Sequence, residues 1–405
     1  MSEHDPDRTA PSDAAEEPVA QGRAVAAPRP ADRGGRAWRR GPLWARLAVV
    51  VAAVLVVAGV VADHVDLNEY VLTPGVAQSV APLVKVPTRR AHRVRGSIFL
   101  TDVYITRVTA LSYLYDELRG DAQILPSETV LGPATPASQL VAQGYLEMEQ
   151  SQSAAKAAAF TSLGYRVARR DTGVVVFAVV TSSPASSALA VGQVVTAVDG
   201  RATPDACAFA RALGTHRAGQ RVRLAVERSH VNTRADMVRG PVVQVTVRLG
   251  RWPSTVPHPT ATPDCVGSGW HGQGYLGVET ETLEAFDFPF PVALRTTSIG
   301  GPSAGLALTL GIIDTLSGGN LTGGRSIAAT GTIAATGAVG EVGGIPEKTV
   351  AVERAGATAF FVPAAQVATA RSKATPPLEV YGVRSLAQVL TDLRRLGGTV
   401  PPPRA

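Results

Sequence analysis

The sequence lacks the motifs of metal binding and of nucleotide binding. Its two cysteines and seven histidines form neither a spaced ligand set nor a Cys-His nucleophile pattern, so we expect no metal and no other cofactor. No Gly-x-x-x-x-Gly-Lys-Ser/Thr phosphate loop occurs, and the glycine cluster at 318–325 lacks the lysine of such a loop. The sequence therefore encodes no ATP-driven unfolding motor.

Charge is scarce and unevenly distributed. Of the 405 residues, 18% are charged and 45% are hydrophobic, which leaves room for two or three domains with sizeable cores. Residues 1–22 are acidic and polar, and the arginine-rich segment after them has no helical or strand period. We expect residues 1–42 to form a disordered cytoplasmic tail. A basic tail could bind nucleic acid, but the apolar run that follows favours the flank of a membrane span, so we expect no nucleic-acid partner.

The apolar run at 47–62 contains no charged residue. Extended back to residue 43, it reaches the ~20 residues that span a bilayer, and we expect one transmembrane helix over 43–62. Arginines crowd its N-terminal side, while Asp63, Asp66 and Glu69 follow it. The positive-inside rule then predicts a cytoplasmic N-terminus and places everything after Asp63 outside the membrane. A signal peptide cleaved after Ala62 is the alternative, but the long region before the run favours a retained single-pass anchor in the cell membrane.

Two glycine-rich segments carry the candidate chemistry: GGPSAG at 300–305, which contains Ser303, and GGIPEK at 343–348, which ends at Lys348. In each, glycine allows a tight turn and proline suits the first turn of a helix. Backbone N–H groups at a helix start would suit an oxyanion beside Ser303. The helix dipole and apolar neighbours would lower the pKa of Lys348 and make it a general base, giving a Ser-Lys nucleophile pair. Taken singly, the serine is more often a cap and the lysine a solvated surface residue.

Residues 298–363 resemble the proteolytic domain of the Lon family of serine proteases. The resemblance rests on both segments and on Thr330-Gly331, Gly337, Val339, Ala355-Gly356-Ala357 and the strand at 360–363. It implies that Ser303 is the nucleophile and Lys348 the general base. It also implies that Thr330 hydrogen-bonds the lysine, with Gly301 and Ala304 in supporting roles. Many Lon proteases have an acidic residue just before Gly-Pro-Ser, where this chain has glycines, so an acidic helper does not carry over.

The middle of the chain resembles a PDZ domain of bacterial proteases. Ser183-Pro184-Ala185, Leu189 and the run 192–200 follow its pattern, with Gln193 in place of the usual aspartate. Such a domain binds an extended peptide by strand addition. We expect the carboxylate loop and its edge strand at Leu163, Gly164, Tyr165 and Val167. A groove that is covered, or that only docks against the protease domain, is the alternative.

An anchor, a PDZ domain and a Lon-type domain without an ATPase together resemble the YlbL-type, PDZ-containing Lon-like serine proteases of Gram-positive and actinobacterial type. We expect an α+β chain with a single N-terminal transmembrane helix and a PDZ domain inserted ahead of a Lon-type α/β proteolytic domain. Cys207 and Cys265 lie outside the membrane in this arrangement, where cysteines can be oxidised. A disulfide between them and two free thiols remain alternatives. The expected segments are the tail 1–42, the transmembrane helix 43–62, an extracytoplasmic region 63–160 that packs with the protease domain, the PDZ domain 161–250, a linker 251–270, the proteolytic domain 271–397 and a disordered tail 398–405.

The expected function is a membrane-anchored, ATP-independent serine endopeptidase that cleaves extracytoplasmic proteins and peptides. The resemblance also implies a homo-oligomer, a hexamer in the Lon family. The alternative is a catalytically silent, membrane-tethered scaffold that binds peptide termini through its PDZ domain. The intact Ser303 and Lys348 segments disfavour this alternative.

Overall fold

The computed structural model describes residues 43–119, 123–131, 137–254, 265 and 274–400. The expected tail 1–42, most of the linker 251–270 and the last residues 401–405 lie outside the described residues. The chain divides into a unit that ends at Val57 and a unit from Ala58 to Ala405, and each is described by itself.

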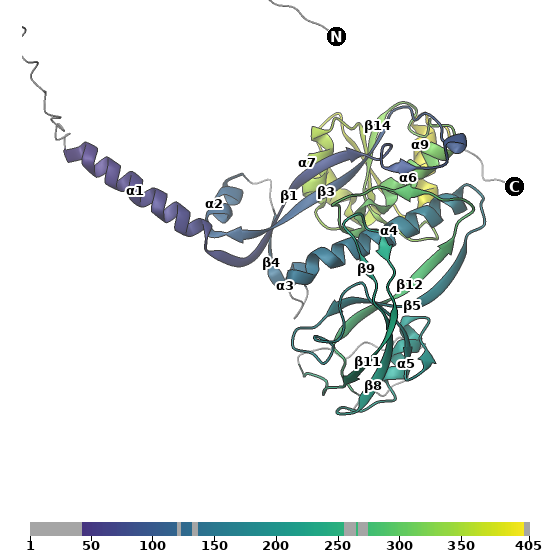
Figure 1. Cartoon of the computed structure of the whole chain (residues 1–405). Helices are drawn as coiled ribbons and strands as arrows, with labels where there is room; N and C mark the ends of the chain where they lie inside the picture. Colours follow the sequence, from purple (N-terminus) through teal and green to yellow (C-terminus); the bar gives the residue numbers. More distant parts are fainter. Residues whose placement is uncertain (1–42, 120–122, 132–136, 255–264, 266–273, 401–405) are drawn as a thin grey trace, which may run out of the picture. The chain divides into compact units, whose positions relative to one another are not determined.

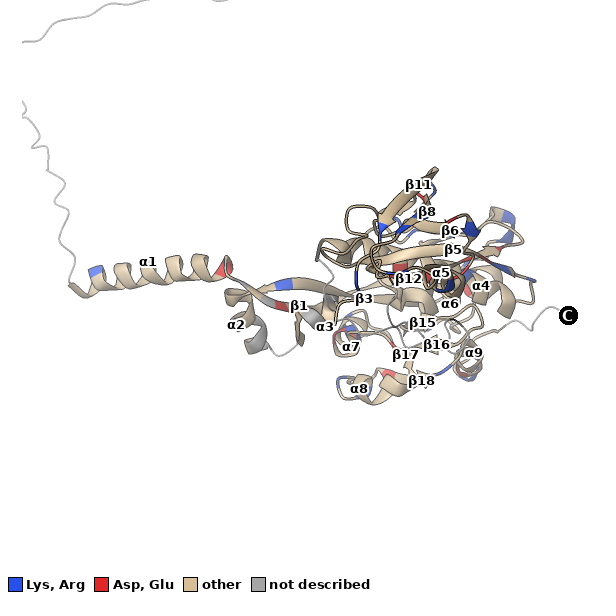
Figure 2. Ribbon diagram, turned by 90° about the horizontal axis from the view of Figure 1, so that it is seen from below, with Lys and Arg blue, Asp and Glu red and all other residues tan. Residues whose placement is uncertain are grey.

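The first described element is the apolar helix α1, Leu43–Asp63. It is long and apolar enough to cross a membrane. Its charged residues lie only near its two ends (Figure 2). The helix begins at the predicted residue and ends one residue later than predicted.

The part of the chain that contains Ser303 and Lys348, the expected catalytic half, is built on a six-stranded sheet (Figure 1). On one side of β3, the strands β14, β17 and β18 pair in parallel. On the other side, β1 pairs antiparallel with β3, and β4 pairs antiparallel with β1. Strands from the segment before the PDZ domain therefore complete the sheet of the segment after it. The order across the sheet is β18 (Glu379–Val383), β17 (Ala359–Pro363), β14 (Ser326–Ala329), β3 (Ser97–Thr109), β1 (Asp66–Ser79) and β4 (Gln123–Pro126).

Helices cover both faces of this sheet. Successive side chains of a strand point to opposite faces, so neighbouring residues of β14 show which helices pack on each face. Ile327 and Ala329 of β14 pack in one core with α4 (Leu140–Ser162), α6 (Gly305–Leu316) and α9 (Leu386–Arg395). Ala328, between them, packs in a second core with α7 (Ile345–Arg354) and α8 (Val367–Arg371). The result is a three-layered α/β domain.

The PDZ domain has a sheet of its own, in the order β11 (Val242–Arg248), β8 (Arg221–Glu227), β6 (Val194–Val198), β5 (Ala168–Val179) and β12 (Val278–Asp287), with β7 (Arg201–Ala202) paired to β6. Helix α5 (Ala206–Leu213) packs Phe209 and Leu213 into its core. Its N-cap is Asp205, whose carboxylate accepts the N–H of Ala208 at 2.7 Å. The last strand, β12, comes from the far side of the linker, so the domain is closed by a part of the chain that leads into the catalytic half.

The remaining described elements are short. They are the helices α2 (Ala110–Arg119) and α3 (Ser127–Leu131), the strand pairs β9 (His230–Val231) with β10 (Met237–Val238), β2 (Val84–Lys85) with β13 (Ala293–Leu294) and β15 (Thr332–Ile333) with β16 (Val339–Gly340), and the 3₁₀ turns Thr88–Arg90, Ala137–Gln139, Pro302–Ala304 and Ala364–Gln366. The α+β class, the apolar N-terminal helix and the order of the two domains are confirmed. In the expected tail 398–405, Gly398 and Thr399 donate backbone hydrogen bonds to Leu393 and Asn320.

Candidate active site

Ser303 lies in a 3₁₀ turn, Pro302–Ala304, that runs directly into α6. Gly301 precedes the turn with a φ of 86°, a conformation that favours glycine. The turn is fixed from two sides. From α4, the carbonyl of Gly144 accepts the N–H of Gly301 at 2.7 Å, and the hydroxyl of Ser151 donates to the carbonyl of Pro302 at 3.0 Å.

The other side of the turn is held by the segment that follows β14. The N–H of Gly331 donates to the carbonyl of Ser303 at 3.0 Å, and the N–H of Leu306 donates back to the carbonyl of Gly331 at 3.1 Å. Thr330 is fully buried, and its hydroxyl also donates to the Ser303 carbonyl, at 3.3 Å. The structure thus places the Thr330 hydroxyl on the backbone of the Ser303 segment, whereas the resemblance implies a bond to the lysine.

Lys348 is the fourth residue of α7, and its side chain is 2% exposed. The helix starts after Gly344, whose φ of 70° makes the turn into it. Burial lowers the pKa of Lys348 to about 8, although the carboxylates of Asp102 and Glu347 act in the opposite direction. Part of the population is therefore neutral near physiological pH, and a neutral amine can accept a proton.

Ser303 and Lys348 line one cavity of about 310 Å³, together with Gly301 and Ala304. The sheet explains why they meet. Strands β3, β14 and β17 are parallel, so the backbone that follows their paired residues emerges at one edge of the sheet. Ligand sites of open α/β sheets form at this edge. The nucleophile turn contacts the end of β14, and β3 supplies residues 101–105 to the cavity wall.

Two polar residues of this cavity, Thr101 and Asp102, carry no motif that sequence analysis could have recognised. Thr101 is 2% exposed, and its hydroxyl has no hydrogen-bond partner in the described part of the chain. Asp102 lies beside it on β3, and its carboxylate accepts the N–H of Val76 at 2.6 Å. Burial raises the pKa of Asp102, and the charge of Lys348 acts against that rise. The sequence signal is only that both residues lie in the region 63–160, which is expected to pack with the protease domain.

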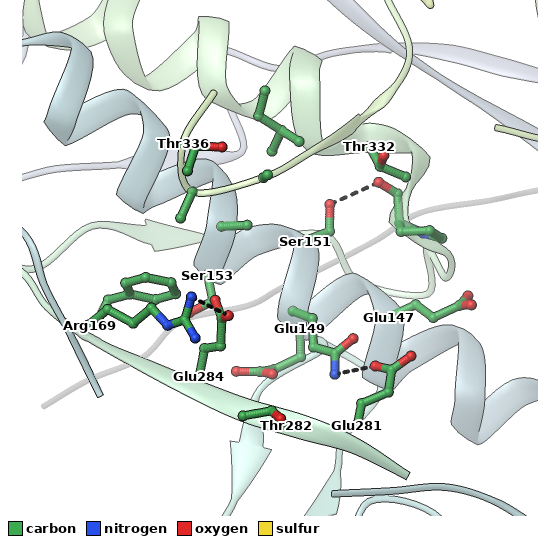
Figure 3. A pocket seen from close by; sticks show the side chains of 17 residues that line it. Glu147, Glu149, Ser151, Ser153, Arg169, Glu281, Thr282, Glu284, Thr332 and Thr336 are labelled. Atoms are coloured by element: carbon green, nitrogen blue, oxygen red, sulfur yellow. Dashed lines mark hydrogen bonds and ion pairs between the residues drawn. The ribbon is translucent and has the colours of Figure 1, made fainter. Parts of the chain in front are cut away.

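Glu147 of α4 lies between this cavity and a second one of about 360 Å³, and lines both. Figure 3 shows Glu147, Glu149, Glu281 and Glu284 around the second cavity, with Arg169 directed at Glu284. The Arg169–Glu284 ion pair is 3.1 Å long, and Gln150 donates to Glu281 at 2.9 Å. Burial, and then the charge of Glu281, raise the pKa of Glu147 to about 7.

The four residues expected to bind a peptide lie near the junction of the two domains. Leu163 is buried in the core of the catalytic half, and Tyr165 and Val167 pack against that core. The Tyr165 ring contacts Phe160 and Phe290, with ring centroids 5.4 and 5.6 Å apart. Gly164 turns the chain between them with a φ of 80°. The strand that follows, β5, is paired with β6 on one side and with β12 on the other.

The two cysteines form a disulfide, Cys207–Cys265, which ties α5 of the PDZ domain to the linker. Among the described residues, no group of three or more His, Cys, Asp or Glu side chains could hold a metal ion.

Comparison with protein families finds matches for two segments of the chain. Residues 161–237 match the PDZ domain, and residues 274–393 match the Lon protease (S16) C-terminal proteolytic domain. No curated protein matches the chain. The chain thus combines a PDZ domain with a Lon serine-protease domain, the arrangement of a PDZ-containing Lon-like protease. Strand β12 lies within the Lon match, although it is hydrogen-bonded into the PDZ sheet.

Proposed function

We propose that this protein is a membrane-anchored serine endopeptidase that hydrolyses extracytoplasmic proteins and peptides with a Ser303–Lys348 dyad and without ATP. The observation that carries the proposal is that Ser303 and a buried Lys348 line one cavity inside a Lon-type proteolytic domain. Hydrolysis needs a nucleophile, a base of suitable pKa and a group that stabilises an oxyanion, and the cavity offers a candidate for each.

In the proposed reaction, the neutral amine of Lys348 accepts the proton of the Ser303 hydroxyl as its oxygen attacks the scissile carbonyl. The resulting ammonium then donates a proton to the leaving amine, and an acyl-enzyme remains on Ser303. A water molecule, deprotonated by the same amine, hydrolyses the ester. The backbone N–H groups of Ser303 and Ala304 are proposed to bind the oxyanion, since the first N–H groups of a helical segment have no partner within it.

The PDZ domain is proposed to select substrates, because an enzyme without a motor depends on unfolded or exposed segments. Strand addition requires an unpaired strand edge. Strand β5 has neighbours on both sides, and the outer strands of the described PDZ sheet are β11 and β12. Of these two, β12 also lines the cavity beside the dyad, through Glu281, Thr282 and Glu284. A peptide added along β12 would therefore lie close to the nucleophile segment.

Membrane anchoring through α1, with the arginine-rich tail in the cytoplasm, completes the proposal. Its support is the length and apolar composition of α1 together with the arginines before it. Assembly into a homo-oligomer belongs to the proposal through the family resemblance alone.

The proposal is tested with the full-length protein in detergent or nanodiscs and an unstructured fluorogenic polypeptide without added nucleotide. We expect hydrolysis by the natural sequence, none by Ser303→Ala, and covalent labelling of Ser303 by a fluorophosphonate. Equal inactivity of the two proteins, with no labelling, would support the catalytically silent scaffold instead.

A further inference from the structure

We propose that Asp102 is a positioning residue for Lys348: its carboxylate holds the ammonium group that Lys348 becomes when it takes the proton of Ser303. This inference rests on the proposed peptidase function and assigns a role to a residue outside both recognised segments. It also places a carboxylate at the dyad of a chain that has glycines where many Lon proteases carry an acidic residue.

The backbone around Asp102 is shaped to hold its carboxylate. The register between β1 and β3 shifts between Pro74 and Ala77, so that Gly75 and Val76 together oppose the single residue Asp102. Such a β-bulge redirects a side chain, and bulges are frequent beside active sites. The freed N–H of Val76 donates to Oδ1 of Asp102 at 2.6 Å. A side chain on Gly75 would overlap this carboxylate, so glycine leaves the space that the carboxylate fills.

The carboxylate held in this way lies beside the dyad. Asp102 lines the same cavity as Ser303 and Lys348, and the charges of Asp102 and Lys348 each stabilise the other. Glu347, on the same helix, is the other carboxylate whose charge acts on Lys348, and Glu147 of α4 lines the same cavity. Asp102 has the larger effect of the two that act directly on the lysine.

The position of the Asp102 carboxylate matters when Lys348 becomes charged by proton transfer. When Lys348 takes the Ser303 proton, it becomes a cation that is almost completely withdrawn from water, which is unfavourable unless a counter-charge is near. A fixed carboxylate at this point stabilises the ammonium without itself accepting the proton. The aspartate of the Ser-His-Asp triad has the same relation to its imidazolium.

The variant Asp102→Asn separates this role from a purely structural one. Asparagine keeps a side-chain oxygen for the Val76 N–H, so the bulge is retained, and only the charge is lost. The negative charge favours protonated Lys348, so its loss lowers the lysine pKa and moves the acid limb of kcat against pH to lower pH. The plateau above the limb should fall by about tenfold or more, because the ammonium formed during the reaction is less stable.

Two other variants make the assignment specific. Asp392→Asn removes an aspartate of α9 that pairs with Arg395 and does not line the Ser303–Lys348 cavity, and should leave both the limb and the plateau unchanged. Glu347→Gln should move the limb less than Asp102→Asn does. A profile of Asp102→Asn that matches the natural protein, or a larger shift in Glu347→Gln, would overturn the proposal while Ser303-dependent hydrolysis still stood.

A second measurement does not depend on hydrolysis. Competitive labelling of amines with acetic anhydride over a range of pH, analysed by mass spectrometry, gives the pKa of Lys348 in the folded full-length protein. We expect a lower value in Asp102→Asn than in the natural sequence. If the protein proved inactive, the proposed function would fall, and an equal lysine pKa in both proteins would reject the role of Asp102 separately.

Discussion

Burial is the main influence on the Lys348 amine, and it sets the pH dependence of the proposed reaction. Because the pKa is lowered to about 8, activity should rise with pH as the ammonium loses its proton, and level off above that value. Lys348→Arg should be inactive at every working pH, because a guanidinium stays protonated. Steady-state rates between pH 6 and 10 test both expectations, and an arginine variant of normal activity would remove Lys348 from the mechanism.

Glu147 complicates this profile, because its pKa of about 7 lies close to that of the lysine. The two groups are separated by measuring the same profile for Glu147→Gln. If the rise of the rate with pH keeps its position in this variant, the rise reports the titration of Lys348. If the rise disappears, it reports the titration of the Glu147 carboxyl group.

The same burial has a cost for stability. The pKa of Lys348 is lower in the folded chain than the usual 10.5, so the unfolded chain binds more protons between these values and stability rises with pH through about 8 to 10.5. Below about pH 8 the folded state carries the full penalty, on the order of 3 kcal/mol as an upper bound. Lys348→Met, of similar length and without charge, should therefore raise Tm at pH 7 and have a smaller effect near pH 10. A lower Tm at pH 7 would indicate that the lysine is stabilised by its surroundings.

At the scale of elements, the candidate site depends on α4 holding the nucleophile turn. Ser151→Ala removes the hydroxyl that donates to the Pro302 carbonyl, a bond that typically contributes about 1 kcal/mol. We expect a severalfold lower kcat with little change in KM, because the turn is less well positioned while the cavity keeps its walls. Ser153→Ala is the matched control, since Ser153 lies two residues further on the same helix and lines the same second cavity, whereas the hydrogen bond to the Pro302 carbonyl comes from Ser151. Equal kinetics of the two variants would contradict the supporting role of Ser151.

Elements with strong local signals could be predicted from the sequence. The segments at 300–305 and 343–348 do lead into α6 and α7, because the glycine turns and the apolar periodicity that specify them are local. The strands β6 and β11 and the helix α5 are likewise specified by apolar patterns within their own segments.

Partners brought together by the tertiary fold could not be predicted in this way. Strand β12 completes the PDZ sheet by pairing with β5, which lies on the other side of the linker in the sequence. The local sequence of β12 does not specify that partner. Asp102 reaches the dyad because β3 is parallel to β14 and because β1 carries a bulge opposite it. A single aspartate in the sequence of β3 predicts neither the pairing of β3 with β14 nor the bulge in β1. The local sequence around Leu163 and Tyr165 predicts a peptide-binding loop. It does not predict that Leu163 is buried in the core of the catalytic half, or that the Tyr165 ring packs against Phe160 and Phe290, because these are tertiary contacts.

At the scale of the whole molecule, the PDZ domain and the catalytic half are connected by more than the linker. Strand β12 pairs with β5, and residues just before β5 pack into the catalytic core. A substrate held by the PDZ sheet would therefore be close to the sheet edge where the dyad cavity opens. The same continuity means that the two domains should unfold together, with a single transition in calorimetry of the full-length protein.

The proposed topology can be tested through the disulfide. Cys207 and Cys265 are bonded to each other, and disulfides form and persist in oxidising compartments outside the cytoplasm. If the arginines before α1 keep the N-terminus inside, both cysteines are exported, and they should react with a maleimide in intact cells only after reduction. Replacing Arg36, Arg39 and Arg40 with glutamate weakens that signal, and the fraction of chains whose cysteines react without reductant should increase. Free thiols in the natural sequence would place the PDZ domain in the cytoplasm, whereas export together with a mature N-terminus at Asp63 would identify α1 as a cleaved signal sequence.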